Sequence, residues 1–349
     1  MKSFLNQLFK KPATAPAQAI VLMYHRIGEA TSDVWDITVS PANFEAQLNY
    51  LKKTGRLIAL PELVAGIHKK YIKPNSIALT FDDGYLNNFL TAKPLLEHYQ
   101  IPATFFVSSV NLGQEKEFWW DELEHLFLFA EQLPPRLSLK IESTLLKYDL
   151  NREAQLTAEI KQKHQTWKAF EQEPPTSRTK IFLEVWQHLQ PLPHAAQQEQ
   201  LQKIRDWAGV KPSNREGYQC MSVPQLQELA NSKLCSIGVH TVHHPALAAH
   251  PKAYQLGELQ ENRQFLEEVI GAEVNLLAYP YGSFNEDTFY AAADLHFYAG
   301  FTTQAKPVVL DDHPYRLGRF QVKNSNRKDF AAQFLKWEAN AAENNNNGT

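Results

Sequence analysis

Short apolar runs of strand length alternate with helical segments along most of this chain, and this alternation constrains the fold more than any other feature. Such runs occur at Ile20–Tyr24, Ile77–Phe81 and Ala103–Val107, and each has the length and residue types of a buried strand. Others follow in the last third of the chain, near residues 234–239, 274–279, 297–302 and 316–322. Because strands connected through helices pair in parallel, the pattern predicts an α/β fold built on a parallel sheet.

Capping residues mark the helices between these runs. Ser40 followed by proline predicts the start of a helix, and Gly55 predicts its end. Further helices are expected at residues 86–99, 222–231 and 252–271, and from Asn285 onward.

Residues from about 111 to 217 break the alternation. They are rich in Leu, Gln, Glu and Lys, and proline pairs interrupt them at 134–135 and 174–175. We therefore expect a mainly helical insertion between two strand–helix units. The proline- and alanine-rich end of residues 1–18 predicts a flexible tail, and the asparagine run within residues 340–349 predicts a disordered tail.

Composition narrows the classes of protein to which the chain can belong. Its 349 residues contain 44% hydrophobic and 21% charged residues, which is typical of a folded globular protein. A net charge of −3 gives no electrostatic argument for nucleic-acid binding. The two cysteines, Cys220 and Cys235, lie outside any Cys-x-x-Cys spacing and are interpreted as small buried hydrophobic residues.

The N-terminal segment lacks the continuous apolar core and small-residue cleavage site of a signal peptide, and no apolar run approaches the roughly 20 residues of a spanning helix. We therefore expect a cytoplasmic protein. Phe4, Leu5, Leu8 and Phe9 would share one helical face flanked by lysines. This segment is either a weak membrane-surface contact or a frayed tail.

Polar side chains follow several of the predicted strands, at the points where the strands end. His25 ends the first run, Asp82 and Asp83 follow the second, and His240 and Tyr281 follow two later ones. In a βα barrel the carboxyl ends of the strands form one face, where active sites are built. These side chains are therefore expected to meet at one mouth.

One carboxylate together with two imidazoles forms a ligand set that suits Zn²⁺ or a similar divalent ion. His240 and His244 are spaced i, i+4, so a helical turn after the strand would place them on one face. His243 is a rival ligand, interpreted as an imidazole beside the site. In the Asp82-Asp83 pair, one carboxylate is left free to move a proton, which indicates metal-assisted hydrolysis.

Three motifs resemble the signatures of one enzyme family. Thr80-Phe81-Asp82-Asp83-Gly84 and His240-Thr241-x-x-His244 resemble the first two motifs of the polysaccharide deacetylases, the NodB-homology or carbohydrate esterase 4 family, and Ala278-Tyr279-Pro280-Tyr281-Gly282 resembles the third. The resemblance covers roughly residues 19–110 and 217–323. It implies a distorted (β/α) barrel over residues 19–339, interrupted by the insertion, and hydrolysis of an N-acetyl, or sometimes O-acetyl, group on a sugar.

The resemblance also implies roles for individual residues. By match, Asp82 is the base, while Asp83, His240 and His244 hold a divalent metal, with Zn²⁺ expected and Co²⁺ or Ni²⁺ as substitutes. The backbone N–H near Tyr281 would help to stabilise the oxyanion.

The chain departs from the family pattern in two places. Ala278 stands where the third motif usually carries an arginine that orients the base, and the late Leu-x-His that supplies the general acid is not evident. Met23-Tyr24-His25-Arg26 resembles the opening strand of the poly-N-acetylglucosamine deacetylase subgroup, which implies His25 as the acid, with His313 as the alternative. Arg319 either replaces the missing arginine as partner of Asp82 or forms a structural salt bridge.

The predicted function is therefore metal-dependent deacetylation of a carbohydrate or glycoconjugate. Two alternatives stay open, a hydrolase of another non-peptide C–N bond and a non-catalytic carbohydrate-binding relative. Trp119, Trp120 and Asp121 begin the insertion and either line the groove or pack its helices. The expected partner is an N-acetylated sugar, oligosaccharide, polysaccharide or lipid-linked glycan, and the sequence gives no oligomeric state.

Overall fold

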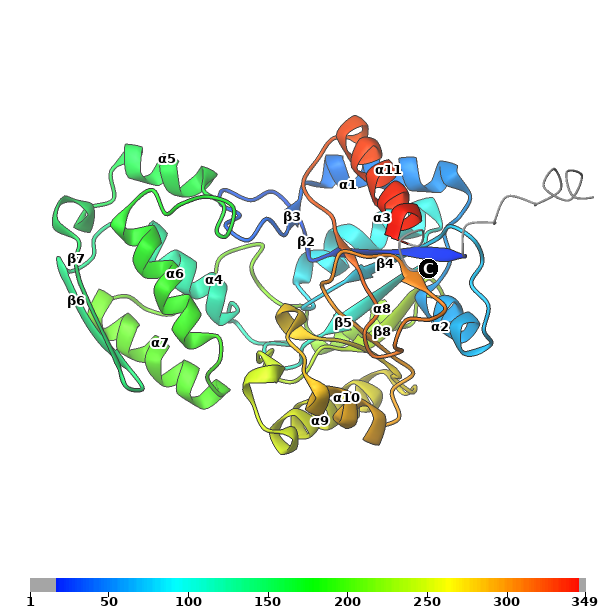
Figure 1. Ribbon diagram of the computed structural model, residues 1–349. Coiled ribbons are helices and arrows are strands. Elements are labelled where there is room, and N and C mark those ends of the chain that lie inside the picture. The colour runs from blue at the N-terminus through cyan, green and yellow to red at the C-terminus, as the bar shows by residue number, and fades with distance from the viewer. Residues whose placement is uncertain (1–16, 345–349) are drawn as a thin grey trace, which may run out of the picture.

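A curled sheet of eight strands forms the centre of the molecule in the computed structural model, which describes residues 17–344 (Figure 1). Six of its strands pair in parallel in the order β10-β9-β8-β5-β4-β1. They are β1 (Gln18–Tyr24), β4 (Ser76–Phe81), β5 (Ala103–Val107), β8 (Cys235–Val239), β9 (Leu276–Ala278) and β10 (Ala299–Phe301). Each lies on a run predicted from the sequence, so the expected parallel sheet is confirmed.

The last strand of the chain brings the two sides of the sheet together. Leu317 forms a parallel bridge with Phe301 of β10, and β12 (Phe320–Gln321) pairs with β1 in parallel. A short strand, β11 (Val308–Val309), pairs with β1 in the antiparallel sense. Residues 317–321 therefore close the gap between β10 and β1, and the sheet becomes a distorted (β/α) barrel as expected.

Helices cover the outside of this barrel, and most begin and end where their capping residues predict. The Ser40 side chain accepts from the Asn43 N–H, and Gly55 ends the helix in the left-handed region with φ 66°. The barrel helices are α1 (Pro41–Thr54), α2 (Leu60–His68), η1 (Asn88–Ala92), α3 (Lys93–Tyr99), α8 (Val223–Ala230), α9 (Lys252–Ile270), α10 (Glu286–Asp294) and α11 (Arg327–Asn344). The sequence analysis did not predict α2 or α11.

The period of two along each strand decides which side chains point into the barrel. Val21 of β1 and Ala78 of β4 belong to an inner cluster with Phe106 and Phe301. Their neighbours in sequence, such as Leu79, pack outward against the helices. Because residues two apart share a face of a strand, Asp82 continues the inner row of Ala78.

Most elements between β5 and β8 lie beside the barrel (Figure 1), and they supply most of a second hydrophobic cluster, to which Val34 and Tyr85 also belong. These elements are α4 (Trp119–Glu124), η2 (His125–Phe129), β6 (Arg136–Ile141), β7 (Thr144–Asp149), η3 (Asn151–Ala154), α5 (Ala158–Thr166), α6 (Ser177–Leu189) and α7 (His194–Ala208). The β6–β7 hairpin is antiparallel and was not expected. In β6, apolar residues alternate with charged and polar ones and every second side chain is buried, so period two, rather than helical composition, decides the structure there.

The ends of the chain bear on three further expectations. Helix α11 continues to Asn344, so residues 340–344, which the sequence assigns to a tail, prolong a helix. The apolar segment at residues 4–9 and most of the expected flexible tail lie outside the described residues. Among residues 17–344, no helix combines the length and apolar character that crossing a membrane requires.

Candidate metal centre and active site

The polar residues predicted from the ends of the strands lie around one cavity at the carboxyl ends of the barrel strands. The cavity measures about 500 Å³. Its lining includes the predicted site residues His25, Asp82, Asp83, His240, His244 and Tyr281. A larger cavity of about 620 Å³ lies beside the amino ends of β8 and β9, and none of these six residues lines it. The six predicted site residues therefore lie at the end of the barrel where active sites of this fold are found.

Three side chains converge at the bottom of this cavity. Asp83 Oδ1 lies 3.4 Å from His240 Nε2 and 3.2 Å from His244 Nε2, and the three candidate ligand atoms lie within 4.8 Å of one another. The three residues are only 3%, 1% and 5% exposed. Asp83 Oδ1 is buried and has no hydrogen-bond partner within residues 17–344. A buried carboxylate oxygen facing two imidazole nitrogens is costly unless a cation lies between them, so the residues fit a divalent metal.

Hydrogen bonds hold the first histidine in the tautomer that a metal ligand needs. His240 Nδ1 donates to the carbonyl of Ala278 at 2.8 Å, which leaves the Nε2 lone pair directed toward Asp83 and His244. For His244, burial lowers the pKa and favours the neutral imidazole. Burial alone would raise the pKa of Asp83, but contacts with both histidines outweigh it and hold that pKa below its usual value.

The loop after β8 brings the histidines together in a way that the sequence analysis did not foresee. A helical turn would have placed them on one face, but residues 240–244 form no helix. Thr241 and His244 instead adopt left-handed backbone conformations, with φ 68° and 56°, and the Thr241 hydroxyl accepts from the His244 N–H at 3.0 Å. The i, i+4 spacing does mark two imidazoles that lie together, but a loop with left-handed residues, and not a helical turn, brings them together.

Asp82 lies beside the candidate metal ligands and forms a two-point ion pair with Arg319. Arg319 Nη1 and Nη2 donate to the two carboxylate oxygens, each at 2.7 Å. The arginine is 0% exposed, and its Nε donates to the carbonyl of Thr302 at 3.1 Å. Burial alone would raise the pKa of Asp82, but the charges of Arg319 and His240 outweigh it and lower that pKa. Asp82 is therefore ionised at neutral pH, with a guanidinium fixing its orientation.

The two histidines considered as the acid lie in different places. His25 lines the cavity, and its buried Nδ1 has no hydrogen-bond partner in the described part of the chain. His313 is exposed, and its ring stacks on Phe289 with centroids 4.9 Å apart. His313 does not line the cavity. The structure thus brings His25, and not His313, to the cavity that the candidate metal ligands line.

The other histidine of the motif points to a different partner. His243 Nδ1 lies 2.7 Å from Glu258 Oε1, and the His243 N–H donates to the second carboxylate oxygen at 2.9 Å. Its ring stacks on His194 with centroids 4.3 Å apart. Glu258 therefore holds His243 outside the cluster of Asp83 and its two histidines.

Aromatic rings surround the cluster. The Tyr281 ring packs against His244 at 4.5 Å between centroids, and the Tyr281 backbone has a left-handed φ of 58°. Trp120 also contacts His244 at 4.5 Å and lines the cavity. Trp119 packs on Trp186 instead, so only one of the two adjacent tryptophans reaches the groove.

Asp121, at the start of the insertion, is a packing residue and not a lining one. It accepts from the Tyr85 hydroxyl at 2.7 Å, and burial raises its pKa to about 8. Seven residues that line the cavity were not predicted, because no motif marks them: Trp35, Ile37, Phe170, Trp186, Gln190, Thr303 and Gln321.

The fold and the site together define a (β/α)-barrel protein whose strand ends carry an Asp-His-His cluster fit for a divalent metal and an ionised aspartate beside it. Comparison with known families names the class more closely. The model of the polysaccharide deacetylase family matches residues 69–129 and 195–300. The chain belongs to this family.

Individual relatives agree with this assignment. The chain is 28% identical over 113 residues to YxkH of Bacillus subtilis, whose name places it among the polysaccharide deacetylases; the match covers 32% of this chain and 39% of that protein. It is 26% identical over 182 residues to a poly-β-1,6-N-acetyl-D-glucosamine N-deacetylase of Staphylococcus aureus, covering 42% of this chain and 62% of that protein. The matched part is thus less than two thirds of either relative.

Among solved structures, the chain resembles IcaB from Ammonifex degensii with a TM-score of 0.57 and 20% identity, over 92% of this chain and 97% of that one. At this identity the likeness shows the fold, and it supports the distorted barrel.

Proposed function

We propose that this protein is a metal-dependent deacetylase that hydrolyses the N-acetyl group of a carbohydrate to acetate and a free amino sugar. One observation carries the proposal. The buried Asp83, His240 and His244 cluster shares a cavity with an ionised aspartate, Asp82, and with His25. Membership of the polysaccharide deacetylase family supports the same reaction.

The donor set favours Zn²⁺, with Co²⁺ and Ni²⁺ as substitutes, because two neutral imidazoles and one carboxylate suit borderline divalent ions and leave a position open. When bound there, the ion would supply a Lewis acid that polarises the acetyl carbonyl and favours deprotonation of water.

The residues of the chain would divide the proton transfers between them. Asp82 accepts the proton of the attacking water as the new C–O bond forms, and Arg319 keeps its carboxylate ionised and oriented. The backbone N–H near Tyr281 donates to the oxygen that gains negative charge. His25 protonates the departing nitrogen as the C–N bond breaks, which is necessary because an amide anion is a poor leaving group.

The missing arginine of the third motif was the main argument for a relative that binds sugars without catalysis. Arg319 supplies a guanidinium to Asp82 from the opposite end of the chain. This contact favours the catalytic alternative.

The substrate class rests on the relatives. The S. aureus protein is named for poly-β-1,6-N-acetyl-D-glucosamine, and we infer that this chain acts on an N-acetylated hexosamine saccharide. An O-acetyl group is the second candidate, because the same groups would cleave an ester with less need for an acid.

Acetate release from zinc-loaded protein tests the proposal. The panel would contain β-1,4- and β-1,6-linked N-acetylglucosamine oligomers, an O-acetylated sugar and an acetyl-lysine peptide. We expect release from at least one saccharide, loss of release in Asp83→Ala, and parent activity in His313→Ala as a matched exposed-histidine control. Release from the peptide alone, or from none of the saccharides, would overturn the assignment.

A further inference from the structure

Three aromatic side chains outside the family motifs form a continuous surface beside the metal cluster. We call Trp35, Phe170 and Trp186 the aromatic wall. Trp35 and Trp186 have ring centroids 4.8 Å apart, and Phe170 lies 5.6 Å from each of them. All three line the cavity that contains Asp82 and Asp83. The wall therefore belongs to the same groove as the reacting groups.

A chain of ring contacts joins the wall to the candidate metal ligands. The Tyr281 ring lies 4.5 Å from His244 and 5.9 Å from Trp186. Trp186 in turn contacts Trp35. The wall thus begins one aromatic ring away from the metal cluster and extends outward from it. A ligand whose acetyl group lies at the cluster would meet the wall with its neighbouring part.

Phe170 carries two unfavourable features at this place. Its side chain is 67% exposed, although it is a large hydrophobic residue. Its backbone φ is 64°, in the left-handed region that is an outlier for a bulky side chain. Backbone strain of this kind concentrates at ligand clamps and active sites. The rest of the fold therefore holds an apolar ring in open solvent at the rim of the groove.

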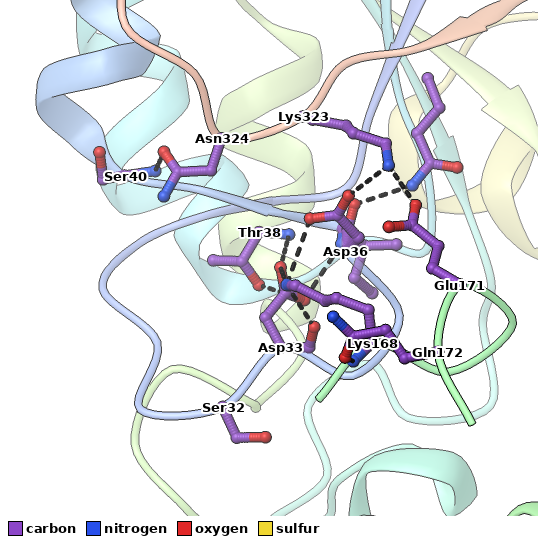
Figure 2. A network of polar contacts seen from close by, with 12 residues as sticks. Ser32, Asp33, Asp36, Thr38, Ser40, Lys168, Glu171, Gln172, Lys323 and Asn324 are labelled. Atoms are coloured by element: carbon purple, nitrogen blue, oxygen red, sulfur yellow. Dashed lines mark hydrogen bonds and ion pairs between the residues drawn. The ribbon is translucent and has the colours of Figure 1, made fainter. Parts of the chain in front are cut away.

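Polar contacts fix the chain on both sides of Phe170 (Figure 2). Lys168 Nζ donates to the Asp33 carbonyl at 2.6 Å and lies 3.2 Å from Asp36 Oδ1. On the other side, Glu171 forms an ion pair with Lys323, which also lies 2.8 Å from Asp36 Oδ2. We call these five residues the polar latch. The latch ties the insertion to the barrel directly around Phe170.

The latch also holds the loop that carries Trp35. The Asp33 carboxylate accepts from the N–H groups of Ile37 and Thr38 at 3.0 and 3.1 Å. Directly before Trp35, the carbonyl of Val34 accepts from the Ala169 N–H at 2.8 Å. Trp35 is therefore fixed by contacts on either side of it, as Phe170 is, and the two rings face each other across the join between insertion and barrel.

We propose that the aromatic wall is a subsite for a second pyranose ring, next to the sugar that loses its acetyl group. The proposal rests on the proposed function and specifies its substrate as a saccharide of at least two units. A pyranose has an apolar C–H face and a rim of hydroxyl groups. The wall offers flat apolar surfaces to the C–H face. Gln190, Thr303 and Gln321 line the same cavity and offer hydrogen-bonding groups to the hydroxyl groups. This mixture of aromatic faces and a few polar groups is typical of ligand sites. The cavity volume of about 500 Å³ also lies within the range of roughly 300–1,000 Å³ that is usual for such sites.

Kinetics on N-acetylglucosamine oligomers of increasing length test the subsite. We expect Phe170→Ala to raise KM by roughly three- to tenfold for the disaccharide and longer oligomers, the equivalent of losing about 0.7–1.4 kcal/mol of aromatic contact. KM for the monosaccharide and kcat for the oligomers should stay close to those of the parent. Tyr71→Ala, which removes another exposed aromatic ring, is the matched control and should change neither constant.

The latch is tested as a positioning device. Lys168→Met should raise KM for oligomers as Phe170→Ala does, and Lys168→Arg should restore it because the charge returns. Added salt should raise the parent's KM for oligomers more than for the monosaccharide, since partly exposed ion pairs are screened. A change in thermal unfolding without any change in KM would show that Lys168 is only structural.

Parallel binding measurements separate failure of the subsite from failure of the proposed function. Oligomers should quench the tryptophan fluorescence of the zinc-loaded protein, and Phe170→Ala should weaken that binding. Binding of oligomers without acetate release would refute the proposed function but would still support the subsite. Equal effects of Phe170→Ala on monosaccharide and oligomers, or no effect on either, would overturn the subsite. An alkyl glycoside of the monosaccharide is a further test. If its KM falls below that of the monosaccharide as much as the KM of the disaccharide does, the subsite is overturned too, because the wall would then bind an apolar aglycone.

Discussion

Replacing Arg319 by methionine tests the inferred arrangement of the base most directly. Arg319 is fully buried and donates to both oxygens of Asp82 at 2.7 Å. Methionine keeps much of the volume but removes the charge, so Asp82 is left as a buried carboxylate without a partner. Breaking a buried pair from one side costs roughly 3–5 kcal/mol. This is a large share of the about 5–15 kcal/mol by which folded domains are stable.

The loss should depend on pH in a defined direction. Burial raises the pKa of Asp82, and in the parent Arg319 and His240 outweigh it, so the folded pKa is lowered. In the parent, the stability from this carboxylate is present above the unfolded pKa of about 3.9 and is lost as the pH falls through the lower folded pKa. Without Arg319 burial prevails, the folded pKa rises, and the variant gains stability as the pH falls through it. The stability difference should therefore be largest near neutral pH and shrink toward about pH 4.

Urea unfolding of Arg319→Met at neutral and mildly acidic pH measures this difference, and the pH profile of kcat/KM reports the base. The acidic limb of the profile should move to higher pH in Arg319→Met, while Arg319→Lys, which keeps the positive charge, should move it less. An unfolding free energy equal to that of the parent at neutral pH, together with an unmoved acidic limb, would refute the inference that Arg319 keeps Asp82 ionised.

Three further predictions address the remaining site residues. Metal analysis should show that Asp83→Ala and His244→Ala lose most of a bound divalent ion while His243→Ala keeps it, and full occupancy in the first two would place the metal elsewhere. Asp82→Asn should retain metal but lose roughly 10²–10⁴-fold in kcat, the usual worth of a positioned base; loss of metal would mean that the roles of the adjacent aspartates are exchanged. His25→Ala should depress hydrolysis of an N-acetyl amide much more than that of an activated acetate ester, whose leaving group needs little protonation, and equal losses on both would indicate a structural role for His25.

Local patterns in the sequence were sufficient for the order of the parallel strands and of most helices in the barrel, with α2 and α11 as the exceptions. A strand or helix end depends on nearby residues, as the Ser40 cap and Gly55 show. Period two along a strand also fixes which side chains point inward, so a polar residue directly after a strand can be assigned to the mouth of the barrel. For this reason the sequence could assign Asp82 and His25 to a common site before any contact was known.

The same local patterns failed where two conformations share a composition. The leucine- and lysine-rich segment that forms β6 and β7 was expected to be helical, but it forms a hairpin whose turn includes Glu142 with φ 49°. The two candidate ligand histidines, His240 and His244, converge through left-handed residues, and not through a helical turn. In the hairpin, the alternation along β6 carried the correct signal and the composition hid it. The left-handed residues of the histidine loop depend on what the loop packs against, which the sequence pattern does not contain.

Only the tertiary structure decided which distant residues meet. Arg319 reaches Asp82 across 237 positions of the chain because residues 317–321 close the barrel between β10 and β1. The aromatic wall joins a loop of the barrel, through Trp35, to the insertion, through Phe170 and Trp186. The sequence by itself determined most elements of the barrel and the candidate metal ligands, because local propensity and strand period act over a few residues. The partner of the base and the shape of the groove depend on barrel closure and on the docking of the insertion, which are properties of the whole chain.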